Sequence, residues 1–328
     1  MPTRPSGRIP TPSCFSGNVQ DPQEGAGAVP DTCAAWSETL SEPMAGTAAV
    51  AASWLCLEQP GPWGRDAPLE SHLDPGIGAR LAERAATSGV RVQLIRRPGR
   101  HPDTGANVPR TVYLAHTRPG ASWLRRAELT DPARLLDLDF GAFARGEHGG
   151  WGVPTTEPVL LVCTNGRRDQ CCALRGISLL REVGQRHEGR LWETTHTGGH
   201  RFAPTAVTLP SGYNYGRLTP HGVDAVLSAA AAGKMTTAHC RGRSAFSQPA
   251  QVAELALREN LGEHAGEALN VVSEADGEVV LRHRDGRRWN VRVRGIASPP
   301  PRPNSCGKAA VAASTWAVER IRRVPDPG

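Results

Sequence analysis

Lysine is nearly absent from this chain of 328 residues. Of the 38 lysine and arginine residues, only Lys234 and Lys308 are lysine. The arginines are spread along the whole sequence, and there are only five phenylalanines and three tyrosines. A nucleic-acid-binding surface needs clustered basic residues and, for single strands, aromatic rings on which bases stack. The net charge of +6 therefore reflects a general arginine bias, and we expect no nucleic-acid partner.

Long apolar runs are also missing. The longest, residues 45–57, falls well short of the roughly 20 apolar residues that a membrane-spanning helix needs. Arg4 and Arg8 are not followed by the apolar core of a signal peptide, so we expect a cytoplasmic protein without a membrane span. Eight cysteines are too few to form a disulfide framework in a chain of this length. They are better candidates for metal ligands, redox groups or core residues.

Composition and periodicity predict four segments. Residues 1–30 are rich in proline, glycine and serine and are expected to form a disordered tail. Residues 31–150 are predicted to form an N-terminal α/β domain. Residues 151–235 run strand, helix, strand, hairpin, helix, the order of a thioredoxin fold, in which Pro204 would be the cis-proline often found beside the site. Residues 236–328 are predicted to form a C-terminal helix and a β-meander.

The predicted elements follow from apolar periodicity and from turn and cap signals. Strands are predicted at residues 51–58, 90–95, 111–116, 158–163, 191–195, 206–209, 213–218, 269–272, 278–283 and 288–293, and helices at 78–88, 131–140, 172–187, 219–232 and 249–260. Residues 54–66 (WLCLEQPGPWGRD) and 160–169 (LLVCTNGRRD) both lead from an apolar strand into a glycine loop with Arg-Asp. The N-terminal domain is therefore a candidate degenerate copy of the second domain.

Two predicted loops carry candidate metal ligands. Cys163 ends a predicted strand and Cys172 begins the next helix, whose N-terminal N–H groups and positive partial charge favour a thiolate. Cys171 is adjacent, so either of the paired cysteines can be the second ligand. His196 and His200 enclose two glycines, which disfavour a helix and predict a tight loop that turns both imidazoles inward.

Thiolate and imidazole ligands suit Zn²⁺ or an iron–sulfur cluster. The eight-residue spacer between Cys163 and Cys172 exceeds the two to four residues usual in zinc knuckles, which favours a cluster without deciding the question. A thiol redox enzyme is a third reading, but the sequence has no C-x-x-C motif and this reading leaves the paired histidines unexplained.

The motifs CTNGRRDQCCALRG, HTGGHRFAPT and LPSGYNYGRL resemble those of the sucrase/ferredoxin-like family, and LEQPGPWGRDA, CRGRS and SCGKA resemble its bacterial branch. The resemblance runs from about residue 33 to residue 310. It implies a thioredoxin-like ferredoxin with a C-x8-C … H-x-G-G-H motif, in which Cys163, Cys172, His196 and His200 ligate a [2Fe–2S] cluster and both histidines bind one iron. Its spacing selects Cys172 over the neighbouring cysteine. Asn165 departs from the histidine expected at that position in bacterial relatives.

The resemblance implies an electron-transfer protein that works with a redox partner protein. Neutral imidazoles make a cluster less negative, and such centres have potentials of roughly −150 to +300 mV against about −400 mV for all-cysteine plant-type clusters. A ligating imidazole can gain a proton on reduction, so we expect the potential to fall as pH rises. We assign no catalytic residues, and no carboxylate pair supports glycosidase activity. The alternative is a non-redox protein with a structural Cys₂His₂ zinc site.

Overall fold

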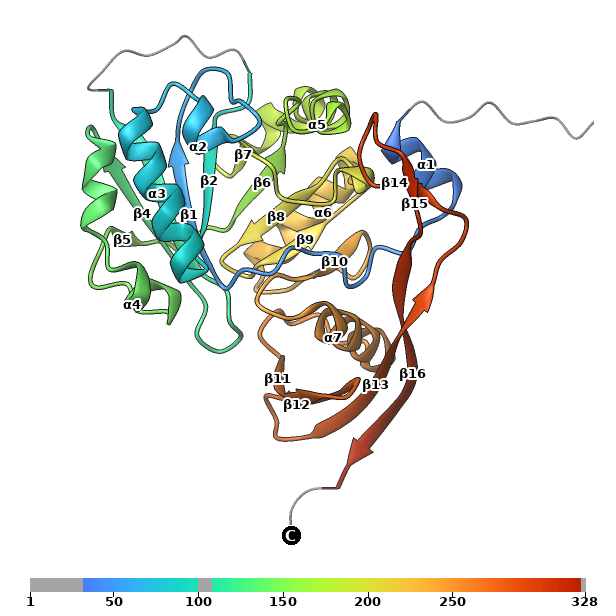
Figure 1. The fold of residues 1–328 in the computed structure, drawn as a ribbon. Helices are drawn as coiled ribbons and strands as arrows, with labels where there is room; N and C mark the ends of the chain where they lie inside the picture. Colours follow the sequence, from blue (N-terminus) through green and yellow to red (C-terminus); the bar gives the residue numbers. More distant parts are fainter. Residues whose placement is uncertain (1–31, 100–107, 326–328) are drawn as a thin grey trace, which may run out of the picture. The chain divides into compact units, whose positions relative to one another are not determined.

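The apolar strands of the sequence assemble into one large sheet. The structure is a computed structural model that describes residues 32–99 and 108–325. The chain divides into Met1–Pro30 and Asp31–Gly328, and all described residues belong to the second unit, so the predicted disordered tail lies outside them. In the second unit ten strands form a sheet of order β10-β9-β8-β6-β7-β2-β1-β3-β4-β5 (Figure 1).

The first half of the sheet is a βαβ unit extended by an antiparallel hairpin. Helix α3 (Pro75–Ser88) connects β1 to the parallel strand β2, and β3 and β4 continue the sheet antiparallel on the other side of β1. Asp74 caps this helix by accepting a hydrogen bond from the Ile77 N–H. The strands are β1 (Ser53–Glu58), β2 (Arg91–Arg96), β3 (Arg110–His116), β4 (Trp123–Leu129) and β5 (Val153–Pro154).

The second half repeats this order and these strand directions. Helix α5 (Gln170–Val183) connects β6 to the parallel strand β7, and β8 and β9 follow antiparallel. Strand order 2-1-3-4 with these directions is that of a thioredoxin fold, which confirms the predicted α/β fold class. The strands are β6 (Val159–Cys163), β7 (Leu191–Thr194), β8 (Ala206–Leu209), β9 (Tyr213–Tyr215) and β10 (Cys240–Arg243).

The two halves join edge to edge through β2 and β7. These strands pair antiparallel at only two positions, and the Arg96 guanidinium and the Glu193 carboxylate add an ion pair of 2.6 Å across the joint. Side chains on one face of both halves pack together, and the rings of Tyr113 and Trp192 meet edge to face at 5.8 Å. The repeated topology supports the interpretation of the N-terminal domain as a degenerate copy, and the boundary between residues 150 and 151 stays a prediction.

Helices cover the other face of the sheet. Leu160 and Val162 pack against leucine and valine side chains of α5 and of α6 (Pro220–Ala231). Leu55 and Leu57 pack in the same way against α3, η1 (Pro132–Asp137) and α4 (Phe140–Ala144). Alternate residues of a strand point to opposite faces, so β1 and β6 are buried on both sides and read as continuous apolar runs.

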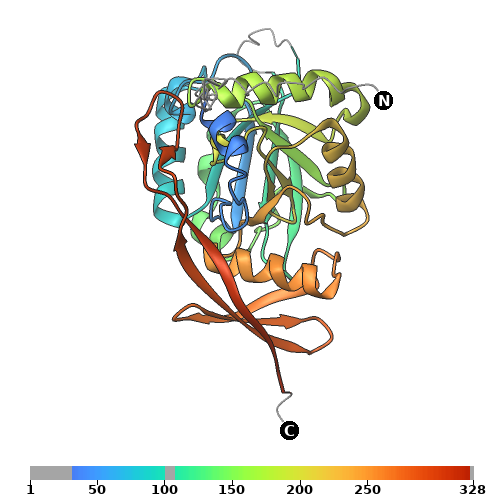
Figure 2. The same cartoon turned by 90° about the vertical axis from the view of Figure 1, so that its right-hand side faces the viewer.

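The C-terminal residues form a second sheet of order β11-β12-β13-β16, packed against α7 (Gln248–Leu261). Long strands β13 and β16 carry the β14–β15 hairpin towards α1 (Cys33–Thr39), and β14 contacts that helix (Figures 1 and 2). No helix in the described part of the chain is both long and apolar enough to cross a membrane. The remaining elements are α2 (Ala67–Glu70), η2 (Gly184–His187), η3 (His200–Phe202), β11 (Leu269–Ala275), β12 (Glu278–His283), β13 (Arg288–Ala297), β14 (Arg302–Pro303), β15 (Ala310–Val311) and β16 (Ser314–Val324).

Most predicted elements are present, with differences at their ends. The helix predicted at residues 131–140 is two short pieces, η1 and α4, because Asp139 starts a new helix by accepting a hydrogen bond from the Ala142 N–H. The helix predicted from residue 172 begins two residues earlier, since Asp169 is its N-cap. The Ala203–Pro204 peptide bond is cis, as predicted. The elements that were not predicted from the sequence are α1, α2, β4, β5, η3, β10, β14, β15 and β16.

Candidate metal centre

The cysteine loop connects β6 to α5. Cys163 is the last residue of β6 and is fully buried. Asp169 caps α5 by accepting a hydrogen bond of 2.9 Å from the Cys171 N–H, which leaves Cys172 in the first helical turn. The loop folds back so that the sulfurs of Cys163 and Cys172, at the two ends of the C-x8-C segment, lie close together, as the sequence predicted.

The histidine loop follows β7 at the same edge of the sheet. Cys163 and Thr194 are paired partners on the parallel strands β6 and β7, so the segments that follow them start side by side. Gly198 and Gly199 have φ of +93° and +73°, left-handed values that glycine adopts without a Cβ penalty. The backbone therefore turns tightly before the short 3₁₀ turn at His200, as a loop and not a helix.

The structure brings three of the four predicted ligands into one compact group. Donor atoms of Cys163, Cys172 and His196 all lie within 4.8 Å of one another. His200 lies beside them, with its ring centroid 5.1 Å from that of His196, but is not part of this group. The Sγ of Cys171 belongs to a different group of side chains, so in the geometry Cys172 is the partner of Cys163.

Two buried imidazole nitrogens beside these thiols have no hydrogen-bond partner among the described residues. The Nδ1 atoms of His196 and His200 are both buried and make no hydrogen bond within the described residues. A buried polar atom without a partner is costly, and functional sites are where such atoms persist. Two free Nδ1 atoms beside two buried thiols are a donor set that fits a metal or an iron–sulfur cluster.

The Cys163 and Cys172 thiols shift each other's pKa in opposite directions. A hydrogen bond from Cys172 lowers the pKa of Cys163 well below its usual range against the opposing effect of burial, and contact with His196 lowers it further. The same hydrogen bond, together with burial, raises the pKa of Cys172. Arg167 and Arg168 are both exposed on the loop. A neighbouring thiol and an imidazole are thus the side chains that favour the thiolate.

The far side of His200 faces a carboxylate. Its Nε2 lies 3.6 Å from Oδ2 of Asp169. Burial lowers the pKa of His200, which keeps the imidazole neutral near pH 7. A neutral imidazole whose second nitrogen faces a carboxylate is the usual state of a metal-ligating histidine.

A family model described as sucrase/ferredoxin-like matches residues 44–242, more than half of the chain. The chain belongs to the sucrase/ferredoxin-like family. This membership confirms the resemblance seen in the motifs, and the matched region includes all four predicted ligands. The bacterial branch stays a prediction. No curated protein and no solved structure matches the chain.

Two arginines within the sucrase/ferredoxin-like region, the buried Arg241 and the half-buried Arg91, hold the histidine loop. Arg241, from β10, donates a hydrogen bond of 2.9 Å to the Gly198 carbonyl and another of 3.0 Å to Oγ1 of Thr47. Arg91, from β2, donates a hydrogen bond of 2.8 Å to the His196 carbonyl. Burial lowers the pKa of Arg241 to about 9 and that of Arg91 to about 10, so both remain cationic at pH 7.

Neither arginine was predicted from the sequence to have a role in the site. Arg241 lies in the CRGRS segment that carried part of the family resemblance, which was the available signal. No such sequence motif distinguishes Arg91 from the other arginines of the chain. His196 also lines an open cavity of about 310 Å³, together with Arg65, Arg91 and Arg168. The candidate metal centre is therefore reached from a positively charged opening.

Proposed function

We propose that this protein holds a [2Fe–2S] cluster through Cys163, Cys172, His196 and His200 and transfers single electrons. One observation carries the proposal. Two buried Nδ1 atoms that have no hydrogen-bond partner among the described residues lie beside two neighbouring buried thiols, where the parallel strands β6 and β7 of a thioredoxin-like sheet end. Thiolate and imidazole together are the ligand types of Rieske-like clusters.

The spread of the four side chains favours a cluster over a single ion. In a tetrahedral zinc site, Zn–S bonds of about 2.3 Å bring every pair of ligand atoms within roughly 4 Å. His200 lies outside the group formed by Cys163, Cys172 and His196, in which donor atoms are within 4.8 Å. A cofactor with two metal atoms has room for a fourth ligand at this larger distance.

The surrounding residues set how such a cofactor behaves. Bound there, a [2Fe–2S] cluster supplies one-electron redox chemistry. The half-buried Arg91 and the buried Arg241 place two positive charges next to the ligand loop, which favours the reduced, more negative state. With Nδ1 of His196 as the ligand atom, its Nε2 is the nitrogen left to exchange a proton at the open cavity. Proton exchange there makes the reduction potential fall as pH rises.

The opening beside His196 is where we place the redox partner. Arg65 and Arg168 are exposed there and Arg91 is half-buried, and these three arginines outnumber Asp66, which also lines the opening, so its charge is positive. A partner protein with an acidic surface would be attracted to it, and such attraction weakens as salt is added. The second candidate function is a structural zinc site, which is favoured by the compactness of the group Cys163, Cys172 and His196.

The test is anaerobic purification followed by iron, acid-labile sulfide and visible absorption measurements. We expect two irons and two sulfides per chain and a brown-red colour that dithionite bleaches. Cys163→Ser should lose the colour, whereas the matched control Cys56→Ala, which removes a buried thiol that belongs to neither group of candidate ligands, should keep it. A colourless wild type that contains no iron and loses one zinc per chain in Cys163→Ser would replace the cluster proposal with the zinc alternative.

A further inference from the structure

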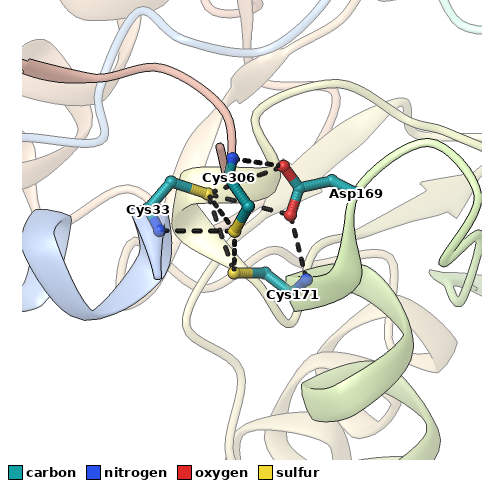
Figure 3. A group of neighbouring side chains, drawn as sticks. All are labelled: Cys33, Asp169, Cys171 and Cys306. Atoms are coloured by element: carbon teal, nitrogen blue, oxygen red, sulfur yellow. Dashed lines mark hydrogen bonds between the residues drawn. The ribbon is translucent and has the colours of Figure 1, made fainter. Parts of the chain in front are cut away.

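Three cysteines that are far apart in the sequence meet beside the candidate metal centre (Figure 3). Cys33 is the first residue of α1, Cys171 lies in the first turn of α5, and Cys306 lies between β14 and β15. Their sulfurs are 3.6 Å apart for Cys33 and Cys171, 3.3 Å for Cys171 and Cys306, and 3.6 Å for Cys306 and Cys33. Cys33 and Cys171 are buried, and Cys306 is partly exposed.

A carboxylate closes the fourth side of this group. Both Asp169 oxygens lie 3.8 Å from the Cys33 sulfur. The carboxylate is held in place, because Oδ1 accepts a hydrogen bond of 2.9 Å from the Cys171 N–H and Oδ2 accepts bonds from the Cys306 N–H at 2.9 Å and the Ser305 hydroxyl at 2.8 Å. These bonds fix the position of the carboxylate beside the three sulfurs.

We propose that Cys33, Cys171, Cys306 and Asp169 bind one Zn²⁺ ion. Zinc binds cysteine sulfur at about 2.3 Å, which places the sulfurs of a tetrahedral site about 3.8 Å apart. The three observed separations, 3.3 to 3.6 Å, approach that value and are nearly equal. Three thiolates and one carboxylate are ligand types that zinc accepts.

The near-equal distances argue against a disulfide. A disulfide brings two sulfurs to about 2.05 Å and leaves the third unused, whereas an ion at the centre uses all three. The seven described cysteines are all free, and the Cys33 N–H donates a hydrogen bond of 3.4 Å to the Cys306 sulfur. Backbone N–H groups that point at sulfur are typical supports of metal-bound thiolates.

This zinc site is distinct from the proposed cluster site. Cys33 and Cys306 lie outside the region matched by the family, and Cys171 and Cys172 serve different groups although they are neighbours in sequence. Asp169, which also faces His200, lies between the two sites. Bound zinc fastens α1 and the β14–β15 hairpin to the start of α5, so three separate segments close over one side of the ligand loops.

The experiment measures zinc per chain in protein purified under reducing conditions and supplied with zinc. We expect one zinc in Cys163→Ser, which lacks the proposed cluster site, and none in Cys163→Ser/Cys306→Ser. The matched control Cys163→Ser/Cys240→Ala removes a lone buried thiol instead and should keep the zinc. Cys306→Ser alone should keep the visible absorption of the cluster, which separates failure of this proposal from failure of the proposed function.

A second measurement tests the zinc site even if the double variant Cys163→Ser/Cys306→Ser does not fold. Replacing zinc by Co²⁺ in Cys163→Ser should produce intense sulfur-to-cobalt absorption, because three thiolates bind the ion. No zinc in Cys163→Ser, zinc retained after Cys306→Ser is added, or a disulfide between any two of Cys33, Cys171 and Cys306 in the wild type would each overturn the proposal.

Discussion

Gly199 is the residue of the histidine loop where one added methyl group should have the largest effect. Its φ is +73°, and a Cβ placed there would lie 2.7 Å from the Cζ atom of Arg241 and nearer still to Nη2. The Arg241 guanidinium cannot move away easily, because this side chain is fully buried and donates hydrogen bonds to Gly198 and Thr47. The Gly199→Ala variant must therefore strain the backbone and displace the guanidinium.

The size of the effect follows from two contributions. A left-handed conformation costs an L-residue roughly 1–2 kcal/mol. Displacing the guanidinium loses its hydrogen bond to the Gly198 carbonyl, and a bond to a charged group contributes about 1.5–3 kcal/mol. We expect Gly199→Ala to lower the free energy of unfolding by about 2.5–5 kcal/mol, a large share of the usual 5–15 kcal/mol.

Gly89 provides the matched control. Its φ is +75°, but a Cβ there would meet no atom within 4 Å, so Gly89→Ala should cost only the backbone strain of about 1–2 kcal/mol. Urea unfolding followed by circular dichroism measures both variants. In the double variant Gly199→Ala/Arg241→Ala the clash is absent, so the two changes should be less than additive. Equal destabilisation by Gly199→Ala and Gly89→Ala would refute the reasoning.

Three further predictions concern ligation, the buried core and pH. His200→Cys should retain a cluster but lower its reduction potential and weaken its pH dependence, as measured by potentiometric titration; an unchanged potential would speak against imidazole ligation. Glu254→Ala leaves the fully buried Arg258 without its ion-pair partner at 2.7 Å and should destabilise the fold by about 3–5 kcal/mol in urea unfolding. Burial raises the pKa of Glu42, but the ion pairs with Arg201 and Arg302 lower it by more, so its net pKa is below the usual value. The contribution of the ionised Glu42 to the stability of the fold is therefore present above about pH 4.3 and is lost as pH falls. Stability should therefore drop less between pH 5 and pH 3 in Glu42→Gln than in the wild type.

Local signals in the sequence were sufficient to predict the strands and loops that carry the proposed ligands. The run PVLLVC predicted β6 because a strand buried on both faces is apolar throughout. Paired glycines predicted the loop after β7, since their left-handed φ values are incompatible with a continued helix. These signals lie within a few residues of the elements that they specify.

Long-range contacts were not predictable in this way. Cys33 and Cys306 are 273 residues apart and meet only because β13 and β16 carry the β14–β15 hairpin to α1, which no spacing encodes. Arg241 was missed for the same reason, as β10 reaches the histidine loop through tertiary packing. The short strand β4 was missed because half-exposed side chains interrupt its apolar pattern.

Nitrogen couplings in the reduced protein test the central claim most directly. We predict that pulsed electron paramagnetic resonance of dithionite-reduced protein, with ¹⁵N-labelled histidine, shows two strongly coupled histidine nitrogens. His196→Cys and His200→Cys should each remove one of them. A reduced cluster without any coupled histidine nitrogen, or a purified chain without iron, would contradict the account.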